Sequence, residues 1–322
     1  MSKEEPVNRA SQWSVNGISI LNGMFGDYLR QQNNGLAIDM ALMRHDKPLQ
    51  LNKASLRQAY PDSGGRLCLF VHGLCCNERS WEFAGDGGQP DGASFGSLLQ
   101  AEFGLTPLFL RYNTGLPLAR NGGHFSALLG ELISAFPVPV TELILVGHSM
   151  GGLIMRSAFE HAATEPASAW PALVSKAFYL GTPHEGADLA KFAHATASVL
   201  EAVPNSITRL IGDVLNLRSE GIKNLRDGKP LGAAQASQGT AAPIWHAGLQ
   251  HYLIAGTLHE DPQHIVNQLF GDGLVRVPGQ AAAGGADMPA IADEHIKVFP
   301  GVHHMALLTD RAVYEQIRTW IQ

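Results

Sequence analysis

The chain of 322 residues contains few cysteines, no long apolar run and no cluster of basic residues. Its three cysteines, Cys68, Cys75 and Cys76, are odd in number and two are adjacent, which disfavours a disulfide framework and favours a reducing compartment. No apolar run approaches the ~20 residues that span a bilayer. Residues 1–10 are polar and charged and lack the apolar core of a secretory signal. We therefore expect a cytoplasmic protein without a transmembrane segment.

Charge and composition exclude further classes of protein. The formal net charge is −6, and lysines and arginines form no runs, so the chain lacks the electrostatic footprint of a protein that binds nucleic acid or an anionic membrane. Hydrophobic residues make up 45% and charged residues 16%, which is ordinary for a globular enzyme and unlike a disordered chain. No internal repeat is visible. The oligomeric state stays open, a homo-oligomer included.

Short apolar runs alternate with helical stretches along the chain. This alternation is typical of parallel strands joined by crossover helices. It predicts the α/β class, with a doubly wound, mostly parallel sheet in a single domain over residues 1–322. A helical extension over residues 1–35 comes before the sheet, because Ser14 to Arg30 has apolar residues at helical spacing. The strand candidates lie at 37–43, 66–71, 106–111, 142–146, 176–180, 251–255 and 295–299.

One region departs from this alternation of strands and helices. Residues 185–245 contain no good strand but two helical stretches, 187–203 and 207–218, followed by a tract rich in Ala, Gly, Ser and Gln over 231–242. A long insertion with its own helices is commonly functional. We expect a helical cap or lid here, because the region directly follows a loop that should reach the active site. The alternative is a fixed helical layer over the sheet edge.

The motif Gly147-His148-Ser149-Met150-Gly151 joins a predicted strand to an apolar helical run. G-x-S-x-G alone is a weak signal, but this context makes it specific. A serine on a tight strand-to-helix turn needs a strained backbone, so the residues two before and two after it must be small. The turn lifts the hydroxyl above the carboxyl edge of the sheet, beside the helix N-terminus. Ser149 is therefore the predicted nucleophile; an inert N-cap serine on a glycine-rich turn is the alternative.

A second loop offers a backbone donor for an oxyanion hole. At a nucleophile turn of this kind one donor is the N–H of the residue after the serine, here Met150. The other comes from the loop after an earlier strand, and Val71-His72-Gly73-Leu74 follows a buried strand candidate. The N–H of Leu74 is the natural second donor, with Gly73 allowing a close approach. His72 lies at the strand end, where we expect it to shape the loop.

Several segments together resemble the lipase and esterase branch of the α/β-hydrolase superfamily. They are VHGL, GHSMGG and YLGTPHEGA, then GDGLV and HHMALL further on. They run from about Leu67 to the C-terminus, roughly four-fifths of the chain, whereas residues 1–60 carry no such match. The chain has HGL where one group of esterases has HGGG. In this respect it resembles the bacterial lipases more closely. The resemblance implies an α/β-hydrolase fold, the chain order serine, acid, histidine, and no cofactor.

The resemblance assigns the catalytic acid to a late loop. Asp272 lies between two glycines in GDGLV. Spacing alone favours a catalytic carboxylate and an ordinary Asp-Gly turn equally. The resemblance favours Asp272 as the acid, ahead of Asp261, Asp287 and Asp293. Its carboxylate would orient the histidine and stabilise the imidazolium that forms in turnover.

The base should follow the last strand, where His303 and His304 are adjacent. Only one of them can face Ser149. The family's ending resembles H-x-x-L-L, which here reads from His304 to Leu308. The resemblance therefore favours His304 as the base, with His303 as its neighbour in the pocket.

Other histidines need a different interpretation. His259 and His264 lie on either side of Pro262, which disrupts a helical ligand face, so we expect no metal site. His148 occupies the variable position of the serine motif, where packing is the usual role. His184, which follows a strand in GTPH, is a candidate for the acyl site. The residues expected to line the substrate site are His72, His148, His184 and His303.

These assignments predict a serine hydrolase that cleaves carboxylic esters with an apolar acyl group, through an acyl-enzyme and without a cofactor. The expected partner is a small-molecule ester, and no nucleic-acid partner is expected. A thioesterase, an amidase or an acyltransferase would use the same triad and differ in the shape of its pocket. A non-catalytic binding protein on the same fold is disfavoured because every triad position is filled.

Overall fold

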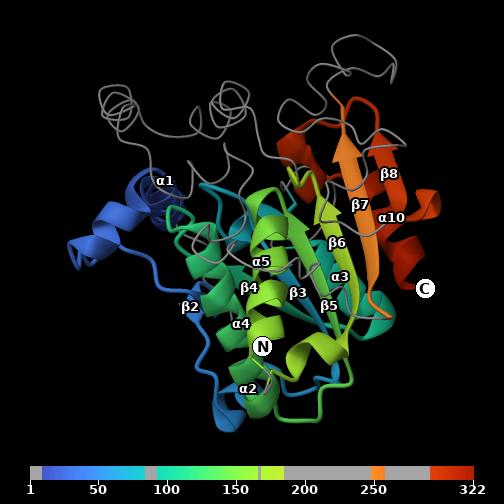
Figure 1. Cartoon of the computed structure of the whole chain (residues 1–322), viewed down its shortest axis with the longest axis horizontal. Helices are drawn as coiled ribbons and strands as arrows, with labels where there is room; N and C mark the ends of the chain where they lie inside the picture. Colours follow the sequence, from blue (N-terminus) through green and yellow to red (C-terminus); the bar gives the residue numbers. More distant parts are fainter. Residues whose placement is uncertain (1–8, 84–92, 166–167, 185–247, 258–290) are drawn as a thin grey trace.

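The computed structural model describes residues 9–83, 93–165, 168–184, 248–257 and 291–322 (Figure 1). These residues build one eight-stranded sheet with helices on both faces. The strands are β1 (Ala41–Arg44), β2 (Lys47–Pro48), β3 (Arg66–Val71), β4 (Thr106–Arg111), β5 (Glu142–His148), β6 (Val174–Leu180), β7 (Gln250–Gly256) and β8 (Ile296–Phe299). The α-helices of the described residues are α1 (Arg9–Gln31), α2 (Lys53–Ala59), α3 (Phe95–Phe103), α4 (Leu118–Ala135), α5 (Met150–Thr164) and α10 (Arg311–Ile321).

The sheet has the strand order β2-β1-β4-β3-β5-β6-β7-β8. β1 pairs antiparallel with β2 and β4, whereas all pairs from β4 to β8 are parallel. The predicted doubly wound, mostly parallel α/β sheet is therefore confirmed. The carboxyl ends of the parallel strands meet at one edge, the upper edge in Figure 1. Open α/β sheets bind their ligands at this edge.

The central strands bury side chains on both faces of the sheet. In β3, Leu67 and Leu69 belong to one hydrophobic core, and Cys68 and Phe70 belong to the other. Helices α4 and α5 cover the first face, and α3 and α10 cover the second (Figure 1). Burial on both faces explains why these strands read as continuous apolar runs in the sequence and not as alternating ones.

The first predicted strand, 37–43, is wrong in its first half, because β1 begins only at Ala41. The side chain of Asn22 in α1 accounts for the difference. Its Nδ2 donates to the Leu36 carbonyl oxygen at 2.8 Å, and its Oδ1 accepts from the Ile38 N–H at 2.9 Å. The backbone just before β1 is therefore bonded to a helix and is not available for pairing in a sheet.

Helix α1 occupies most of the N-terminal region 1–35 in which a helix was predicted. Its buried Ile20 joins the core on the α4/α5 face of the sheet. The predicted cap over residues 185–245 lies outside the described residues, so it stays a prediction.

Candidate active site

Ser149 lies on the turn between β5 and α5, with φ of 53° and ψ of −123°. For a residue with a Cβ this left-handed φ costs on the order of 1–3 kcal/mol, and it persists only where the surroundings impose it. A Cβ on Gly147 would come within 2.7 Å of the Gly152 backbone nitrogen. A Cβ on Gly151 would come within 2.2 Å of the Val71 carbonyl oxygen. Glycine is therefore required on both sides of the serine by the close approach of β3, β5 and α5.

This turn leaves the Ser149 hydroxyl available. Ser149 is the N-cap residue of α5, yet its side chain makes no capping hydrogen bond. Its backbone N–H donates to the Leu180 carbonyl oxygen at 2.8 Å, which ties the turn to the end of β6. Met150 is the first residue of α5, so its N–H has no acceptor within the helix. A donor and the positive end of a helix dipole thus lie directly beside the serine.

His304 begins the short helix η4 (His304–Leu308) and is only 4% exposed. Its ring centroid lies 4.6 Å from that of His148, the residue before the serine. The Nε2 of His148 donates to the His304 carbonyl oxygen at 3.1 Å. The structure therefore brings the chain after β8 to the end of β5, next to Ser149.

The end of β6 supports the His304 ring from another side. Gly181 has a φ of 57°, and a Cβ there would lie 2.9 Å from two atoms of the His304 imidazole. The adjacent His303 is the N-cap residue of η4 and is exposed. The two neighbouring histidines therefore occupy different environments: His304 is buried against the serine turn and His303 is in solvent.

The loop from residue 72 to 77, between β3 and the short helix η1 (Glu78–Trp81), approaches the serine from the other side. We call it the β3–η1 loop. A Cβ on Gly73 would be 3.1 Å from the Ser149 Cβ. Leu74 is buried, and its N–H donates to no acceptor among the described residues. Cys75 has a φ of 61°, and its N–H donates to Thr114 Oγ1 at 3.2 Å.

His72 at the start of this loop is completely buried. Its Nδ1 donates to the Gly73 carbonyl oxygen at 2.9 Å, and its ring stacks on Tyr112 with centroids 4.5 Å apart. The Tyr112 hydroxyl donates to the His72 carbonyl oxygen at 2.8 Å. Burial lowers the pKa of His72 to about 4, so its imidazole is neutral at neutral pH. These contacts brace the backbone that leads to Leu74.

The three cysteines, two in the loop and one in β3, are poor nucleophiles at neutral pH. Cys68, Cys75 and Cys76 are all buried and carry free thiols. Burial raises the pKa of all three, that of Cys76 to about 11. Because the thiolate is the reactive form, these side chains act as small apolar residues at neutral pH.

A second group of polar side chains lies at the carboxyl end of β6, and of its members only His184 was predicted. Arg156 of α5 is buried, and its guanidinium donates to His184 Nδ1 at 3.2 Å. Burial and then the Arg156 charge lower the pKa of His184 to about 3. Tyr179 of β6 packs edge-on against the His184 ring and hydrogen-bonds to His251 Nδ1 at 3.2 Å. Arg156 could have been found from the sequence, because it follows Ser149 by two helical turns and shares its helix face.

The catalytic acid favoured from the sequence, Asp272, lies outside the described residues, as do Asp261 and Asp287. Asp293 is described and is exposed at the start of η3 (Asp293–His295). Within the described ranges, no group of three His, Cys, Asp or Glu side chains could hold a metal ion. Over the same ranges, no helix is long and apolar enough to cross a membrane.

Comparison with known families agrees with the α/β fold described above. Residues 68–316 match the model of the Alpha/beta hydrolase family. The match spans more than half of the chain, and the chain therefore belongs to the α/β-hydrolase family. Comparison with curated proteins gave no match.

Solved structures with a similar fold include two forms of one lipase. The mature form of lipase BlEst2 from Bacillus licheniformis has a TM-score of 0.51 and 18% identity, over 80% of this chain and 92% of that chain. Its propeptide form has a TM-score of 0.51 and 19% identity, over 79% of this chain and 50% of that chain. Phospholipase PlaB from Legionella pneumophila has a TM-score of 0.47 and 16% identity, over 80% of this chain and 59% of that chain. At these identities the likeness concerns the fold.

We expect His72→Asn to reduce the pH dependence of stability between about pH 6.5 and pH 4. The folded protein keeps His72 neutral down to its lowered pKa of about 4, whereas the unfolded chain takes up a proton near pH 6.5. The unfolded state then binds the extra proton, so the free energy of unfolding decreases as the pH is lowered from 6.5 to 4, by about 3 kcal/mol for this residue. Asparagine keeps a donor for the Gly73 carbonyl oxygen but cannot titrate.

Urea unfolding at several pH values measures this difference. The absolute stability of the variant falls because the stacking on Tyr112 is lost, so the slopes with pH are compared and not the levels. Wild-type and variant slopes that coincide over the window would show that His72 is not the titrating group.

Proposed function

We propose that this chain is a serine hydrolase that cleaves carboxylic esters through an acyl-enzyme, with Ser149 as the nucleophile. The observation that carries the proposal is the backbone of Ser149. Ser149 lies at a strand-to-helix turn and has a φ of 53°. The glycines two residues before and after it have no room for a side chain. This arrangement costs free energy, and it places the hydroxyl beside the helix N-terminus. A purely structural N-cap serine would adopt an extended backbone and bond to the helix, and Ser149 does neither.

His304 is the proposed general base. Its burial against His148 and Gly181 supports this choice over the exposed His303. His304 takes the proton from the Ser149 hydroxyl as the oxygen attacks the ester carbonyl carbon. The imidazolium then gives this proton to the departing alkoxide, which leaves as the alcohol. A water molecule, deprotonated by the same imidazole, cleaves the acyl-enzyme and restores the serine.

The backbone N–H groups of Leu74 and Met150 are the proposed oxyanion hole. Support comes from the lack of room for a side chain between Gly73 and Ser149, which places the β3–η1 loop beside the serine, and from the position of Met150 at the start of α5. The Leu74 N–H has no acceptor among the described residues. The Met150 N–H has none within α5, because it is in the first turn of that helix. Two such donors stabilise the negative oxygen of the tetrahedral intermediate more than the ground-state carbonyl.

The substrate class we propose is an uncharged ester with an apolar acyl group. Burial lowers the pKa values of His72, His148 and His184, so these imidazoles are neutral at neutral pH and add no charge to the site. In keeping with this proposal, the Bacillus licheniformis protein of similar fold is named a lipase. We assign the acid of the triad to Asp272, as the sequence predicts.

We expect Ser149→Ala to fold like the wild type and to lose ester hydrolysis by about 10⁶-fold. Alanine has the same Cβ as serine, so the strained turn is unchanged while the attacking oxygen is gone. Hydrolysis of p-nitrophenyl esters and labelling with a fluorophosphonate, followed by peptide mass spectrometry, measure the effect. Ser134→Ala is the matched control, because Ser134 lies exposed on α4 and should leave both signals at wild-type level. Labelling of another residue in the wild type would overturn the assignment.

We expect His304→Ala to lower kcat by several orders of magnitude, and His303→Ala to change it by no more than a few-fold. The reason is that only His304 lies against the serine turn, whereas His303 is in solvent. Steady-state kinetics on the two variants test this directly, with circular dichroism to verify folding. A greater loss in His303→Ala would reverse the assignment of the base.

We expect Asp272→Asn to lower kcat by about 10⁴-fold with little change in stability, because an amide favours the wrong tautomer of the catalytic histidine. Asp293→Asn is the control, since Asp293 is exposed before β8. Kinetics with the same esters measure both variants. Full activity of Asp272→Asn would move the acid to another loop.

A further inference from the structure

Helix α1 lies outside the residues that match the family, 68–316, yet it packs directly against the β3–η1 loop. A Cβ on Gly23 of α1 would collide with Cys75 Sγ and would lie 3.2 Å from both the Cα and the backbone nitrogen of Cys75. One turn further, the Gly26 carbonyl oxygen accepts from Asn113 Nδ2 at 2.9 Å. The helix thus contacts the loop that carries Leu74 and also the segment that follows β4.

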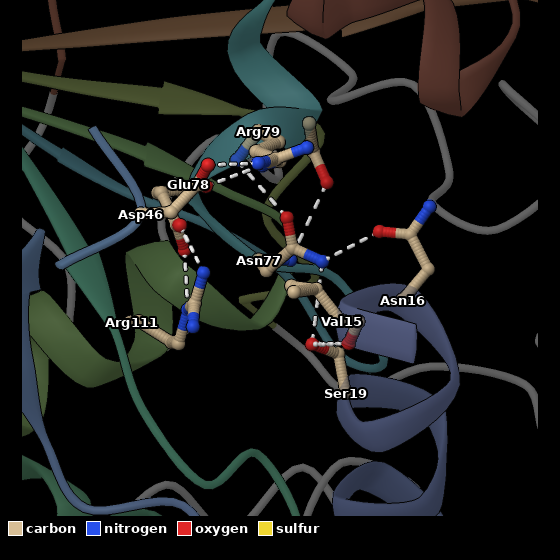
Figure 2. Close-up of polar contacts among 9 residues, drawn as sticks. Val15, Asn16, Ser19, Asp46, Asn77, Glu78, Arg79 and Arg111 are labelled. Carbon is tan, nitrogen blue, oxygen red and sulfur yellow. Dashed lines mark hydrogen bonds and ion pairs between the residues drawn. The ribbon is translucent and has the colours of Figure 1, made fainter. Parts of the chain in front are cut away.

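Asn77 links the end of the β3–η1 loop to α1 (Figure 2). Its Nδ2 donates to Asn16 Oδ1 at 2.9 Å and to Ser19 Oγ at 3.2 Å. Its Oδ1 caps η1 by accepting from the Arg79 N–H at 3.0 Å. A side-chain amide has two N–H donors, and both serve α1 here. Asn77 is only 3% exposed, so water cannot easily replace a lost bond.

Ion pairs hold η1 on the side away from α1 (Figure 2). Arg111 at the end of β4 pairs with Glu78, and Arg79 pairs with Asp46 in the turn between β1 and β2. Glu78 and Arg111 are largely shielded from solvent, and the Arg111 Nε donates to the Glu78 carboxylate at 2.7 Å. With the bonds of Asn77, these pairs fix η1 between α1 and the sheet.

We propose that α1 positions the Leu74 N–H for oxyanion stabilisation, with Asn77 as the positioning residue; this inference rests on the proposed function. Leu74 lies between Gly73, which has no room for a side chain beside Ser149, and Cys75, whose φ is 61°. A left-handed non-glycine residue persists only when its surroundings hold it. On one side the Cys75 N–H donates to Thr114 Oγ1, and on the other side α1 packs against Cys75.

Small shifts of such a loop have large kinetic consequences. Misplacing a catalytic group by about 1 Å can cost about 10²-fold in rate. Removing one oxyanion donor costs about 10²- to 10³-fold in kcat. A displaced Leu74 N–H should therefore lower kcat strongly and leave KM nearly unchanged, because the donor acts mainly in the transition state. A general loss of packing would not produce this split.

Gly23→Ala is the first test. Alanine favours a helix over glycine, so α1 itself is not weakened, but the new methyl collides with Cys75 Sγ and crowds the Cys75 backbone, so residue 75 must shift. We expect kcat for p-nitrophenyl esters to fall about 10- to 100-fold with KM within about 2-fold. The affinity for a trifluoromethyl ketone, which forms a tetrahedral adduct with the serine, should fall in parallel. Gly130→Ala is the matched control, because a Cβ there meets nothing within 4 Å.

Asn77→Asp is the second test. Aspartate is as good an N-cap as asparagine, so η1 keeps its cap while both donors to Asn16 and Ser19 are lost. We expect about a 10-fold loss of kcat, again without a matching rise in KM. The control is Asp39→Asn, which breaks the exposed ion pair of Asp39 with Arg30 at the other end of α1 and should keep the wild-type kcat.

Hydrogen exchange of the amides at 72–77 gives a readout that is independent of activity. Faster exchange there in Gly23→Ala and Asn77→Asp, but not in the controls, is expected. Folded variants with the wild-type kcat and unchanged exchange would overturn the positioning role. If the wild type neither cleaves esters nor takes up the fluorophosphonate, the proposed function is wrong, and the exchange data then decide by themselves whether α1 holds the loop.

Discussion

The contact between the first turn of α5 and the end of β3 is the constraint on which the rest of the site depends. Gly151 approaches the Val71 carbonyl oxygen so closely that a single methyl group would separate the two elements. This approach places the turn that carries Ser149 against the residues that follow β3, so Gly73 can touch the serine. The two N–H groups proposed as the oxyanion hole, those of Leu74 and Met150, belong to these two elements' adjoining ends. Both the strained serine backbone and the braced loop follow from packing these backbones so tightly.

Much of this arrangement could be predicted from the sequence, because the decisive signals are local. β3 and β4 have the predicted bounds, and β3 is a buried apolar run that follows a turn. The serine turn could be predicted because steric exclusion leaves only glycine beside it. Where the competing partner is remote, prediction failed. Ile38 reads as part of a strand, but its N–H bonds to Asn22, which lies in a helix earlier in the chain.

The histidines show the same limit. Sequence alone could not separate His303 from His304, because neighbours in a chain share every local signal and differ only in what packs on them. The partnership of Arg156 with His184 also depends on two elements that meet only in the folded sheet. Burial then changes the chemistry of these side chains, since His72, His148 and His184 all have lowered pKa values. These three imidazoles therefore add no positive charge at neutral pH, and the positive charge beside His184 is the Arg156 guanidinium.

The hydrogen bond from His148 to the His304 carbonyl oxygen bears on thermal motion. The chain of His304 follows β8, a four-residue strand at the edge of the sheet, where strands are least restrained and breathing motions are largest. His148 belongs to β5, in the sheet centre, and is the residue next to the serine. The bond spans from the centre to the edge over β6 and β7, so the backbone of His304 is coupled mechanically to that of Ser149. The bond therefore restrains how far the His304 backbone can move from the residue next to Ser149.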